Sequence, residues 1–375
     1  MKELILGGQA LVIGRGSLEH LATVEAGRAF IVTGGSSMLK SGVVGRIEAI
    51  MRQKGAVTAV HSGIPANPDT GIIQSGVAAM RAFAPDLIIA VGGGAALDAA
   101  KAIALFGEYP ELDFAAALAG NLPGRRRAVR LVAIPSTSGT GSEVTKTAVI
   151  TFRDRDLKVG LKTPAFIPDI AILDADLTLT MPAAVVAETG LDALTHAVEG
   201  FTNPAIDDFT GPMAVGAVAG LCEYLPVSYT EGTAASREKV HHFQALAGLV
   251  LGNVGVGASH GISHAVGGKF GLGHGLINAI VLPHVIDFNS RDSRVKAMYD
   301  RLAATVGAAD FVAVVRSLNA RLAIPASLAA AGLDADAFTA ALPQLVANSL
   351  LGSTRVNPVP FTAGDMEALL RRAWA

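Results

Sequence analysis

Hydrophobic and polar positions divide the chain into two halves with different spacing. The first half carries short apolar runs that are rich in β-branched residues, which is typical of strands buried on both faces of a parallel sheet. These predicted strands are residues 30–33, 56–60, 87–91, 130–134, 147–151 and 170–173. Between them, residues 41–54 and 72–84 place apolar side chains three and four positions apart, as covering helices do. The alternation predicts an α/β domain with an open parallel sheet and right-handed crossovers.

After Pro182 the pattern changes to longer segments with helical spacing. The predicted helices are residues 183–201, 213–225, 234–256, 259–270, 276–288 and 295–306. No strand is predicted in this half, and Pro182 marks the start of its first helix. The sequence therefore predicts two domains, an α/β domain over residues 1–182 and an all-helical domain over residues 183–375.

Composition limits which binding partners and which cellular compartment are expected. The chain has 375 residues, which is more than one hydrophobic core usually serves. Its formal net charge of −2 gives no electrostatic reason to expect a nucleic-acid partner. No apolar run approaches the ~20 residues that span a bilayer, so no membrane partner is expected. The single cysteine, Cys222, cannot form an internal disulfide, which favours a cytoplasmic protein.

Two polar loops follow predicted strands. Gly92, Gly93 and Gly94 come directly after the strand at 87–91 and before a helix-like segment. Such a turn lets a phosphate approach the backbone and face the amides that begin the helix, although it matches neither the Rossmann nor the P-loop fingerprint. The loop at 134–145 carries Ser and Thr hydroxyls that can hold a ribose, a phosphate or a carboxamide, or satisfy their own backbone. Two such loops at one edge of a sheet favour a dinucleotide.

The helical half contains a group of regularly spaced polar residues. Asp192 and His196 are four positions apart, and so are His260 and His264, so each pair shares one face of a helix. His274 follows between two glycines. A lone histidine in an apolar helix is usually a satisfied core residue, but burying this many polar groups without a common purpose would be costly. Carboxylate and imidazole suit Zn²⁺ or Fe²⁺, so the pattern predicts a divalent metal site.

In this order the motifs resemble the iron-containing (group III) alcohol dehydrogenases over nearly the whole chain. The matching segments are residues 91–101, 134–145, 167–174, 189–199 and 260–289. The resemblance implies a dehydroquinate synthase-like fold, in which an N-terminal dinucleotide-binding domain precedes a helical domain. It also implies a homodimer, for which residues 4–12 are a candidate edge strand.

The resemblance assigns site residues. It implies Asp192, His196, His260 and His274 as metal ligands, and the spacing of fourteen between the last two matches the family. It places His264 beside the nicotinamide as a proton relay. The residues predicted to bind the cofactor are Gly34, Ser36, Gly92, Gly93, Gly94, Asp98, Ser136, Thr137, Thr140, Ser142 and Lys158.

The implied function is hydride transfer between NAD(P)H and a small aldehyde or primary alcohol. Fe²⁺ or Zn²⁺ would act as the Lewis acid toward the substrate oxygen, and the ligand set suits both ions.

The chain departs from the family pattern at several positions. Many members carry an aspartate for the adenosine ribose where this chain has Gly34, followed by Ser36 and Ser37. Because a carboxylate would repel a 2′-phosphate, its absence favours NADP(H) over NAD(H). Ala95 replaces a usual serine, Gly273 replaces a usual proline, and the segment at 357–358 lacks a cysteine that some members have. These changes concern the substrate rather than the metal.

Three alternatives remain open at this stage. A maleylacetate reductase-like enone diacid reductase is suggested by residues 267–272, but those enzymes lack the metal aspartate that Asp192 supplies here. A dehydroquinate synthase-type lyase would need many basic residues for its phosphorylated substrate, and the helical half has few near the histidines. A catalytically silent nucleotide- or metal-binding protein would not need every metal ligand that the resemblance implies.

Overall fold

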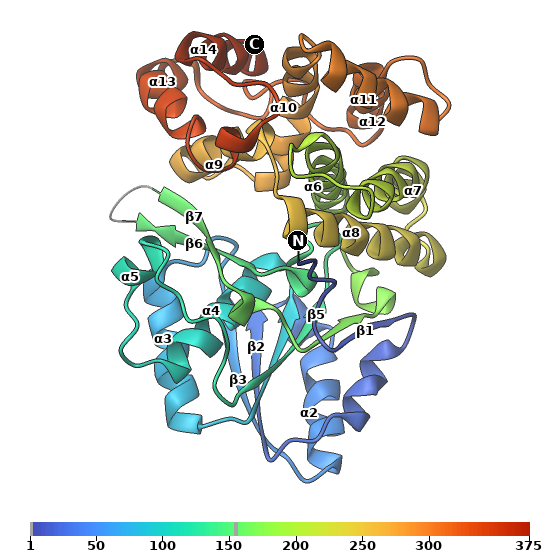
Figure 1. Cartoon of the computed structure of the whole chain (residues 1–375). Coiled ribbons are helices and arrows are strands. Elements are labelled where there is room, and N and C mark those ends of the chain that lie inside the picture. Colours follow the sequence, from blue (N-terminus) through green and yellow to red (C-terminus); the bar gives the residue numbers. More distant parts are fainter. Residues whose placement is uncertain (1–2, 154–156) are drawn as a thin grey trace. The chain divides into compact units, whose positions relative to one another are not determined.

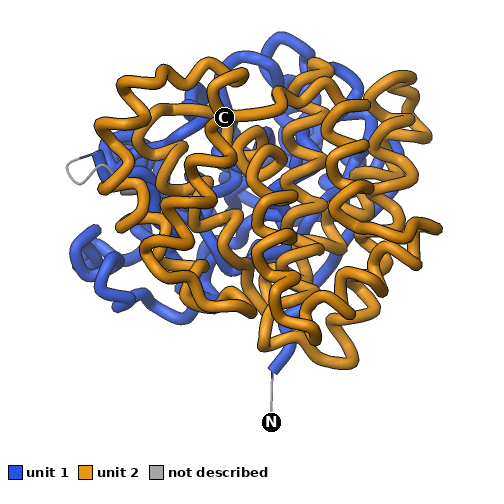
Figure 2. Tube along the Cα trace, turned by 90° about the horizontal axis from the view of Figure 1, so that it is seen from above, with its two compact units in different colours: residues 1–180 blue, residues 181–375 orange. Residues whose placement is uncertain are grey.

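The computed structural model describes residues 3–153 and 157–375, and the chain forms two compact units (Figure 2). Unit 1 is Met1–Thr180 and unit 2 is Met181–Ala375. The sequence predicts the boundary after residue 182, which is the residue before the first helix of unit 2.

Unit 1 is built on a six-stranded sheet in which the described strands all run parallel (Figure 1). Its order is β1-β8-β5-β4-β2-β3. The strands are β1 (Ala10–Ile13), β2 (Arg28–Gly34), β3 (Val57–Ile64), β4 (Leu87–Gly92), β5 (Arg130–Pro135) and β8 (Ile170–Leu173). Every residue of β4 is buried, as expected for a central strand covered on both faces.

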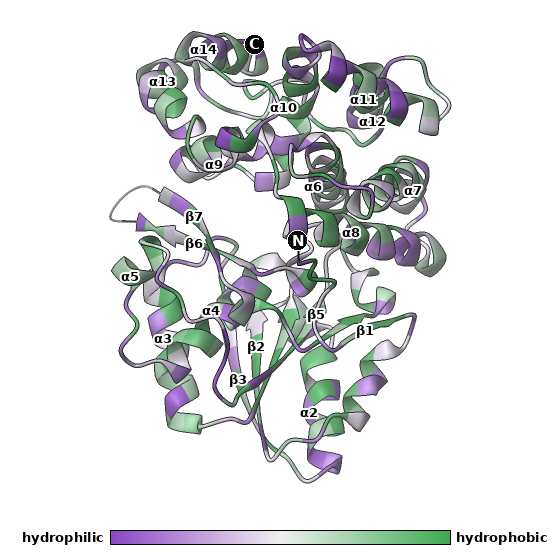
Figure 3. Ribbon diagram, viewed as in Figure 1, coloured by the Kyte–Doolittle hydropathy of each residue, from purple (hydrophilic) through white to green (hydrophobic). Residues whose placement is uncertain are grey.

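Helices cover both faces of this sheet. Alternate strand residues such as Ile31 and Ile89 form a core with α2 (Val43–Gln53) and the 3₁₀ helix η1 (Ser17–Thr23). The other strand residues pack against α3 (Thr70–Phe83) and α4 (Gly94–Glu108). Figure 3 shows hydrophobic and hydrophilic stretches alternating along α2 and α3, as expected of helices with one buried face. The predicted parallel α/β domain is confirmed.

One predicted strand belongs to a different sheet. Residues 147–151 were expected in the parallel sheet, but they lie in β6 (Thr147–Phe152), which pairs antiparallel with β7 (Leu157–Lys162). That assignment is wrong, and β7 was not predicted. Residues of β6 alternate between buried and half-buried, which is the pattern of a strand with one covered face. A run of five β-branched or apolar residues does not reveal its pairing partner.

Unit 2 is helical, and the structure describes no strand within residues 181–375. The six predicted helices are present as α6 (Ala183–Thr202), α7 (Thr210–Thr230), α8 (Ala234–Val254), α9 (Ala258–Phe270), α10 (His274–Asn289) and α11 (Ser293–Thr305). Three more helices follow that the sequence did not predict: α12 (Phe311–Arg321), α13 (Ala335–Ser349) and α14 (Ala363–Trp374).

The central helices α6 and α10 are buried along most of their length. Among the described residues no single helix is long and apolar enough to cross a membrane, and only the bent pair α8 and α9, at 98°, passes the length and composition test together.

Candidate functional site

The two predicted loops of unit 1 lie side by side at the carboxyl edge of the sheet. Gly92 at the end of β4 pairs with Pro135 at the end of β5, and the Ser136 amide donates to the Gly92 carbonyl at 2.8 Å. The chain passes from β2 outward to β3 and then returns to β4 on the other side of β2. This reversal is the point at which open parallel sheets bind ligands, beyond the carboxyl ends of the strands.

Two of the three glycines are required by the structure for different reasons. Gly92 has a φ of +148°, which residues with a Cβ rarely adopt. A Cβ at Gly94 would lie 2.5 Å from Cγ2 of Thr140. At Gly93 the nearest atom to an added Cβ would be Cγ2 of Thr137 at 3.5 Å, an ordinary contact. The glycine run therefore lets the second loop pack against the start of α4.

The Gly94→Ala substitution is expected to destabilise the protein by about 1–3 kcal/mol, because its methyl group overlaps the Thr140 side chain. Gly93→Ala is the matched control and is expected to leave the unfolding free energy within about 0.5 kcal/mol, as at sites without such an overlap. Urea denaturation of both variants measures the difference. Equal stabilities would show that the two loops do not pack as described.

Asp98 and Lys101 on α4 make hydrogen bonds to the loop at 134–145 and to the strand that follows it. The Asp98 carboxylate accepts from the Ser142 hydroxyl at 2.6 Å and from the Val149 amide at 2.9 Å. The Lys101 ammonium donates to the carbonyls of Thr145 and Thr147 at 3.0 and 2.8 Å. Burial raises the pKa of Asp98, against the attraction of Lys101, and burial lowers the pKa of Lys101 to about 8. Asp98 and Ser142 thus bind each other, and these contacts hold the loop in place.

The remaining predicted cofactor residues lie at or just after the ends of parallel strands, and on β7, in unit 1. Gly34 ends β2, and Ser36 is exposed and precedes the short helix α1 (Ser37–Lys40). No aspartate or glutamate occurs in the segment 34–40. Lys158 lies on β7, where its ammonium donates to Asn67 at 2.9 Å, and its charge lowers the pKa of Asp98 slightly against burial. Ser136 and Gly92 are buried where their strands meet.

The predicted metal ligands converge in unit 2. Asp192, His260 and His274 each offer a donor atom, and these donor atoms all lie within 4.8 Å of one another. Oδ1 of Asp192 lies 3.6 Å from Nε2 of His274, 3.7 Å from Nε2 of His260 and 3.9 Å from Nε2 of His196. Asp192, His196 and His260 are buried, and His274 is half-buried. One carboxylate surrounded by imidazole nitrogens is a donor set that suits Zn²⁺ or Fe²⁺.

Asn278 lies within this group and donates hydrogen bonds to its members. Its amide nitrogen donates to Oδ1 of Asp192 at 2.7 Å and lies 3.3 and 3.2 Å from Nε2 of His260 and His274. An amide NH₂ has two hydrogens and one goes to Asp192, so the second is available to only one of the two Nε2 atoms. Both Nε2 atoms lie on the Asp192 side of their rings, as shared metal ligation requires.

Ser263 identifies the tautomer of His274. Its hydroxyl donates to the His274 carbonyl at 2.9 Å and lies 2.8 Å from Nδ1 of the same residue. A hydroxyl has one hydrogen, so toward Nδ1 it must accept. The neutral ring of His274 therefore carries its proton on Nδ1, and Nε2 has the lone pair.

Glu199 contacts His260 from the other side. Its carboxylate lies 2.6 Å from Nδ1 of His260 and is 4% exposed. Burial alone would raise its pKa, but the hydrogen bonds from His260 and from the Gly257 amide bring the pKa below its ordinary value. Glu199, Ser263 and Asn278 were not predicted from the sequence. A signal existed for Glu199, since Asp192, His196 and Glu199 at i, i+4 and i+7 share one face of α6.

His264 lies beside the predicted ligands. Its ring stacks on His274 with centroids 5.1 Å apart and meets His260 edge-on at 6.4 Å. Cys222 is partly buried on α7, and burial raises the pKa of its thiol to about 12, so the thiol stays protonated at neutral pH. This agrees with its interpretation as a small hydrophobic residue.

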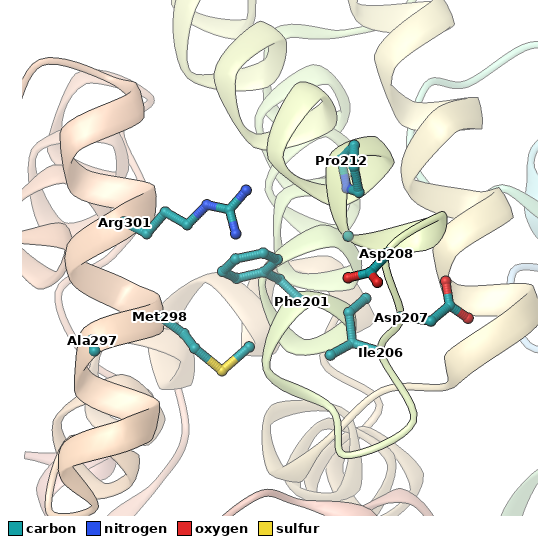
Figure 4. A pocket seen from close by; sticks show the side chains of 9 residues that line it. Phe201, Ile206, Asp207, Asp208, Pro212, Ala297, Met298 and Arg301 are labelled. Carbon is teal, nitrogen blue, oxygen red and sulfur yellow. The ribbon is translucent and has the colours of Figure 1, made fainter.

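A surface hollow elsewhere in unit 2 contains none of the predicted site residues (Figure 4). It has a volume of about 360 Å³ and lies between the end of α6, the start of α7 and α11. The Arg301 guanidinium lies 5.6 Å from the centre of the Phe201 ring on its wall. Neither the histidines nor the glycine turn lines it, so the chemistry of the candidate site lies elsewhere.

Comparison with known proteins identifies both halves of the chain. A family model described as iron-containing alcohol dehydrogenase matches residues 8–175. A second model, described as the C-terminal part of the Fe-containing alcohol dehydrogenase family, matches residues 186–374.

Individual relatives are similar over nearly the full length. The NADPH-dependent butanol dehydrogenase of Clostridium saccharobutylicum is 35% identical, covering 95% of this chain and 94% of the relative. The 1-propanol dehydrogenase of Citrobacter freundii is 34% identical and covers 96% of each chain. Among solved structures, the iron-containing alcohol dehydrogenase of Thermococcus thioreducens has a TM-score of 0.93 at 31% identity, with 99% of both chains covered.

Proposed function

Because this chain belongs to the iron-containing alcohol dehydrogenase family, we propose that Asp192, His196, His260 and His274 hold the divalent ion of an NAD(P)-dependent enzyme. The chain is an oxidoreductase that interconverts aldehydes and alcohols with a nicotinamide cofactor. The observation that carries the ligand proposal is the convergence of one carboxylate and two imidazoles within 4.8 Å, with a third imidazole beside the carboxylate.

The chain's own groups prepare this chemistry. In the reducing direction an aldehyde, NAD(P)H and a proton give an alcohol and NAD(P)⁺. A divalent ion would supply Lewis-acid polarisation of the substrate oxygen when bound. Ser263 and Glu199 contact the Nδ1 atoms of His274 and His260, so the Nε2 atoms of the neutral rings are left to ligate the ion. His264, stacked on His274, is proposed to relay the proton that the substrate oxygen takes up.

We further propose NADP(H) as the preferred cofactor and small primary alcohols and their aldehydes as substrates. Gly34 at the end of β2 presents no carboxylate to a 2′-phosphate, and Ser36 beside it is an exposed hydroxyl donor. The butanol dehydrogenase named above is NADPH-dependent, and the second relative is a 1-propanol dehydrogenase. The donor set suits Fe²⁺ and Zn²⁺ alike, and the family supports iron.

A homodimer in the cytoplasm is also proposed. Leu11 and Ile13 are 42% and 57% exposed on β1, which is an edge strand of the sheet. An unpaired strand edge with exposed apolar side chains is a template for pairing with a second copy. The lone Cys222 agrees with a reducing compartment.

The alternative functions are less favoured. A maleylacetate reductase and a dehydroquinate synthase would both be compatible with this fold, but the relatives reported above are alcohol dehydrogenases. The donor group around Asp192 brings a carboxylate and two imidazoles together, which a metal-free reductase would not need.

The test is a cofactor assay on protein purified without oxygen. Oxidation of NADPH and of NADH is followed with a panel of small aldehydes, before and after chelation and after return of Fe²⁺ or Zn²⁺. We expect turnover that disappears on chelation and returns with one of the ions, and that is faster with NADPH. Turnover that is indifferent to chelation would exclude the metal-dependent function and favour enone diacids as substrates.

A further inference from the structure

Glu199 accepts three hydrogen bonds from one short segment of the chain. Its Oε1 accepts from the Ser259 amide at 2.6 Å, and its Oε2 accepts from the Gly257 amide at 2.8 Å and contacts Nδ1 of His260 at 2.6 Å. Glu199 belongs to α6, whereas Gly257 is the N-cap of α9. A carboxylate of α6 therefore caps the first turn of α9, a place where negative charge is stabilised.

The same contacts determine the state of the His260 ring. A carboxylate that already accepts two amide hydrogens has no hydrogen to donate, so Nδ1 of His260 is the donor. In the neutral ring that ligates a metal, the opposite nitrogen, Nε2, then carries the lone pair, 3.7 Å from Oδ1 of Asp192. His260 is 3% exposed, so no solvent competes for either nitrogen.

We propose that Glu199 is the positioning residue of the metal centre, which fixes the tautomer and the ring orientation with which His260 ligates the ion. The inference rests on the proposed function, since it takes His260 as a ligand. One face of α6 would then supply two ligands, Asp192 and His196, together with the carboxylate that orients a third. A carboxylate or carbonyl behind a ligating imidazole raises its basicity and holds its direction.

Glu199→Gln separates positioning from simple packing. Glutamine keeps the volume and one acceptor oxygen, so a backbone amide of α9 can still be bound. With its oxygen at the place of Oε2 it still accepts from Nδ1 but without the negative charge that raises the basicity of His260. With its NH₂ group there, Nδ1 has to accept and the proton of His260 moves to Nε2. In both orientations His260 becomes a weaker ligand without a change in side-chain volume.

Asn357 provides a matched control at the same helix terminus. Its Oδ1 lies 3.3 Å from the Ala258 amide and accepts from it, and no hydrogen bond to His260 is described. Asn357→Ala removes this acceptor together with the hydrogen bonds of Asn357 to Asn289 and Val359, so it tests the effect of lost stability around the start of α9 while the contact of Glu199 with His260 remains. Glu199→Asp, which keeps the charge and withdraws it by one methylene, serves as a second variant should Glu199→Gln not fold.

The experiment measures metal affinity of the full-length protein rather than turnover. Metal-free parent and variants are titrated with Zn²⁺ and Co²⁺ against a chromophoric chelator, and unfolding of each metal-free protein is followed by circular dichroism. We expect Glu199→Gln to bind about 10–100-fold more weakly, with an altered visible Co²⁺ spectrum, and Glu199→Asp to fall between it and the parent. Asn357→Ala is expected to lower the melting temperature while keeping the parent affinity. Adding Glu199→Gln to His260→Ala should cost no further affinity, because the residue acts through His260.

Two results would overturn the inference. One is a Glu199→Gln protein with the affinity and Co²⁺ spectrum of the parent. The other is a further loss of affinity on adding Glu199→Gln to His260→Ala, which would show that the carboxylate acts on the whole helix pair. A parent protein that binds neither ion is a different outcome, since it would overturn the proposed metal function itself.

Discussion

Replacing Asp192 by alanine is expected to abolish metal binding and to lower kcat/KM for aldehyde reduction by about 10²–10³-fold, the size of losing a main electrostatic stabiliser. Oδ1 of Asp192 is the common neighbour of the imidazoles, at 3.6 to 3.9 Å from the three Nε2 atoms. It is also the only carboxylate in the described donor group. Without it, neutral imidazoles alone would face a divalent cation. Metal content by elemental analysis and NADPH oxidation measure the two losses together.

Asp192→Asn isolates the charge, because asparagine keeps the volume and an acceptor for Asn278. We expect it to lose most of the ion as well. Glu188→Gln is the matched control, since Glu188 lies one turn earlier on α6 and outside the donor group, and it should keep the ion. Retention of metal and turnover by Asp192→Ala would remove this residue from the ligand set.

The second large effect is expected at the end of β2, where Gly34→Asp should lower kcat/KM for NADPH by about 10²-fold relative to NADH. Placing a carboxylate beside a 2′-phosphate costs several kcal/mol, and each 1.4 kcal/mol is about tenfold. The structure admits the side chain, because a Cβ at Gly34 would have its nearest neighbours at 3.7 Å (Ile64 carbonyl) and 3.9 Å (Ala96 Cβ). Steady-state kinetics with both cofactors measure the change in preference.

Gly34→Asn has nearly the same shape without the charge, so it should change the ratio of NADPH to NADH efficiency far less. An unchanged ratio in Gly34→Asp would show that the 2′ group of the cofactor is not bound at the end of β2. Loss of activity with both cofactors in Gly34→Asn would indicate a steric effect instead.

Periodicity predicted the central strands of the parallel sheet and the first six helices of unit 2. The parallel strands β2, β4 and β5 and the helices α6 to α11 were recognised because their apolar spacing is a local property of the chain. The β6–β7 hairpin was misassigned because strand pairing depends on a partner that a single run of residues does not contain. Helices α12 to α14 carry clear caps, such as Asp310, Asp334 and Thr362, that the apolar pattern alone did not reveal.

The candidate site also combines features that the sequence shows with features that only folding creates. The spacing of Asp192 with His196 and of His260 with His264 is visible in the sequence, since helical neighbours lie four positions apart. The residues that make hydrogen bonds to the candidate ligands are not visible in this way. Glu199, Ser263 and Asn278 contact them from other turns and other helices. Residues 61 and 86 positions apart, as in the contacts of Glu199 with His260 and of Asn278 with Asp192, meet only after folding.

The sequence by itself therefore determined the kinds of element and the family resemblance, and it predicted a two-domain division and the types of the candidate ligands, all of which depend on local spacing and residue chemistry. The tertiary structure decided which strands pair and at which glycine Thr140 leaves no room for a Cβ. It also decided which nitrogen of His260 and His274 carries the proton. The physical reason is that a proton's place on an imidazole is set by the group behind the ring. That group is brought there by helix packing rather than by its position in the chain.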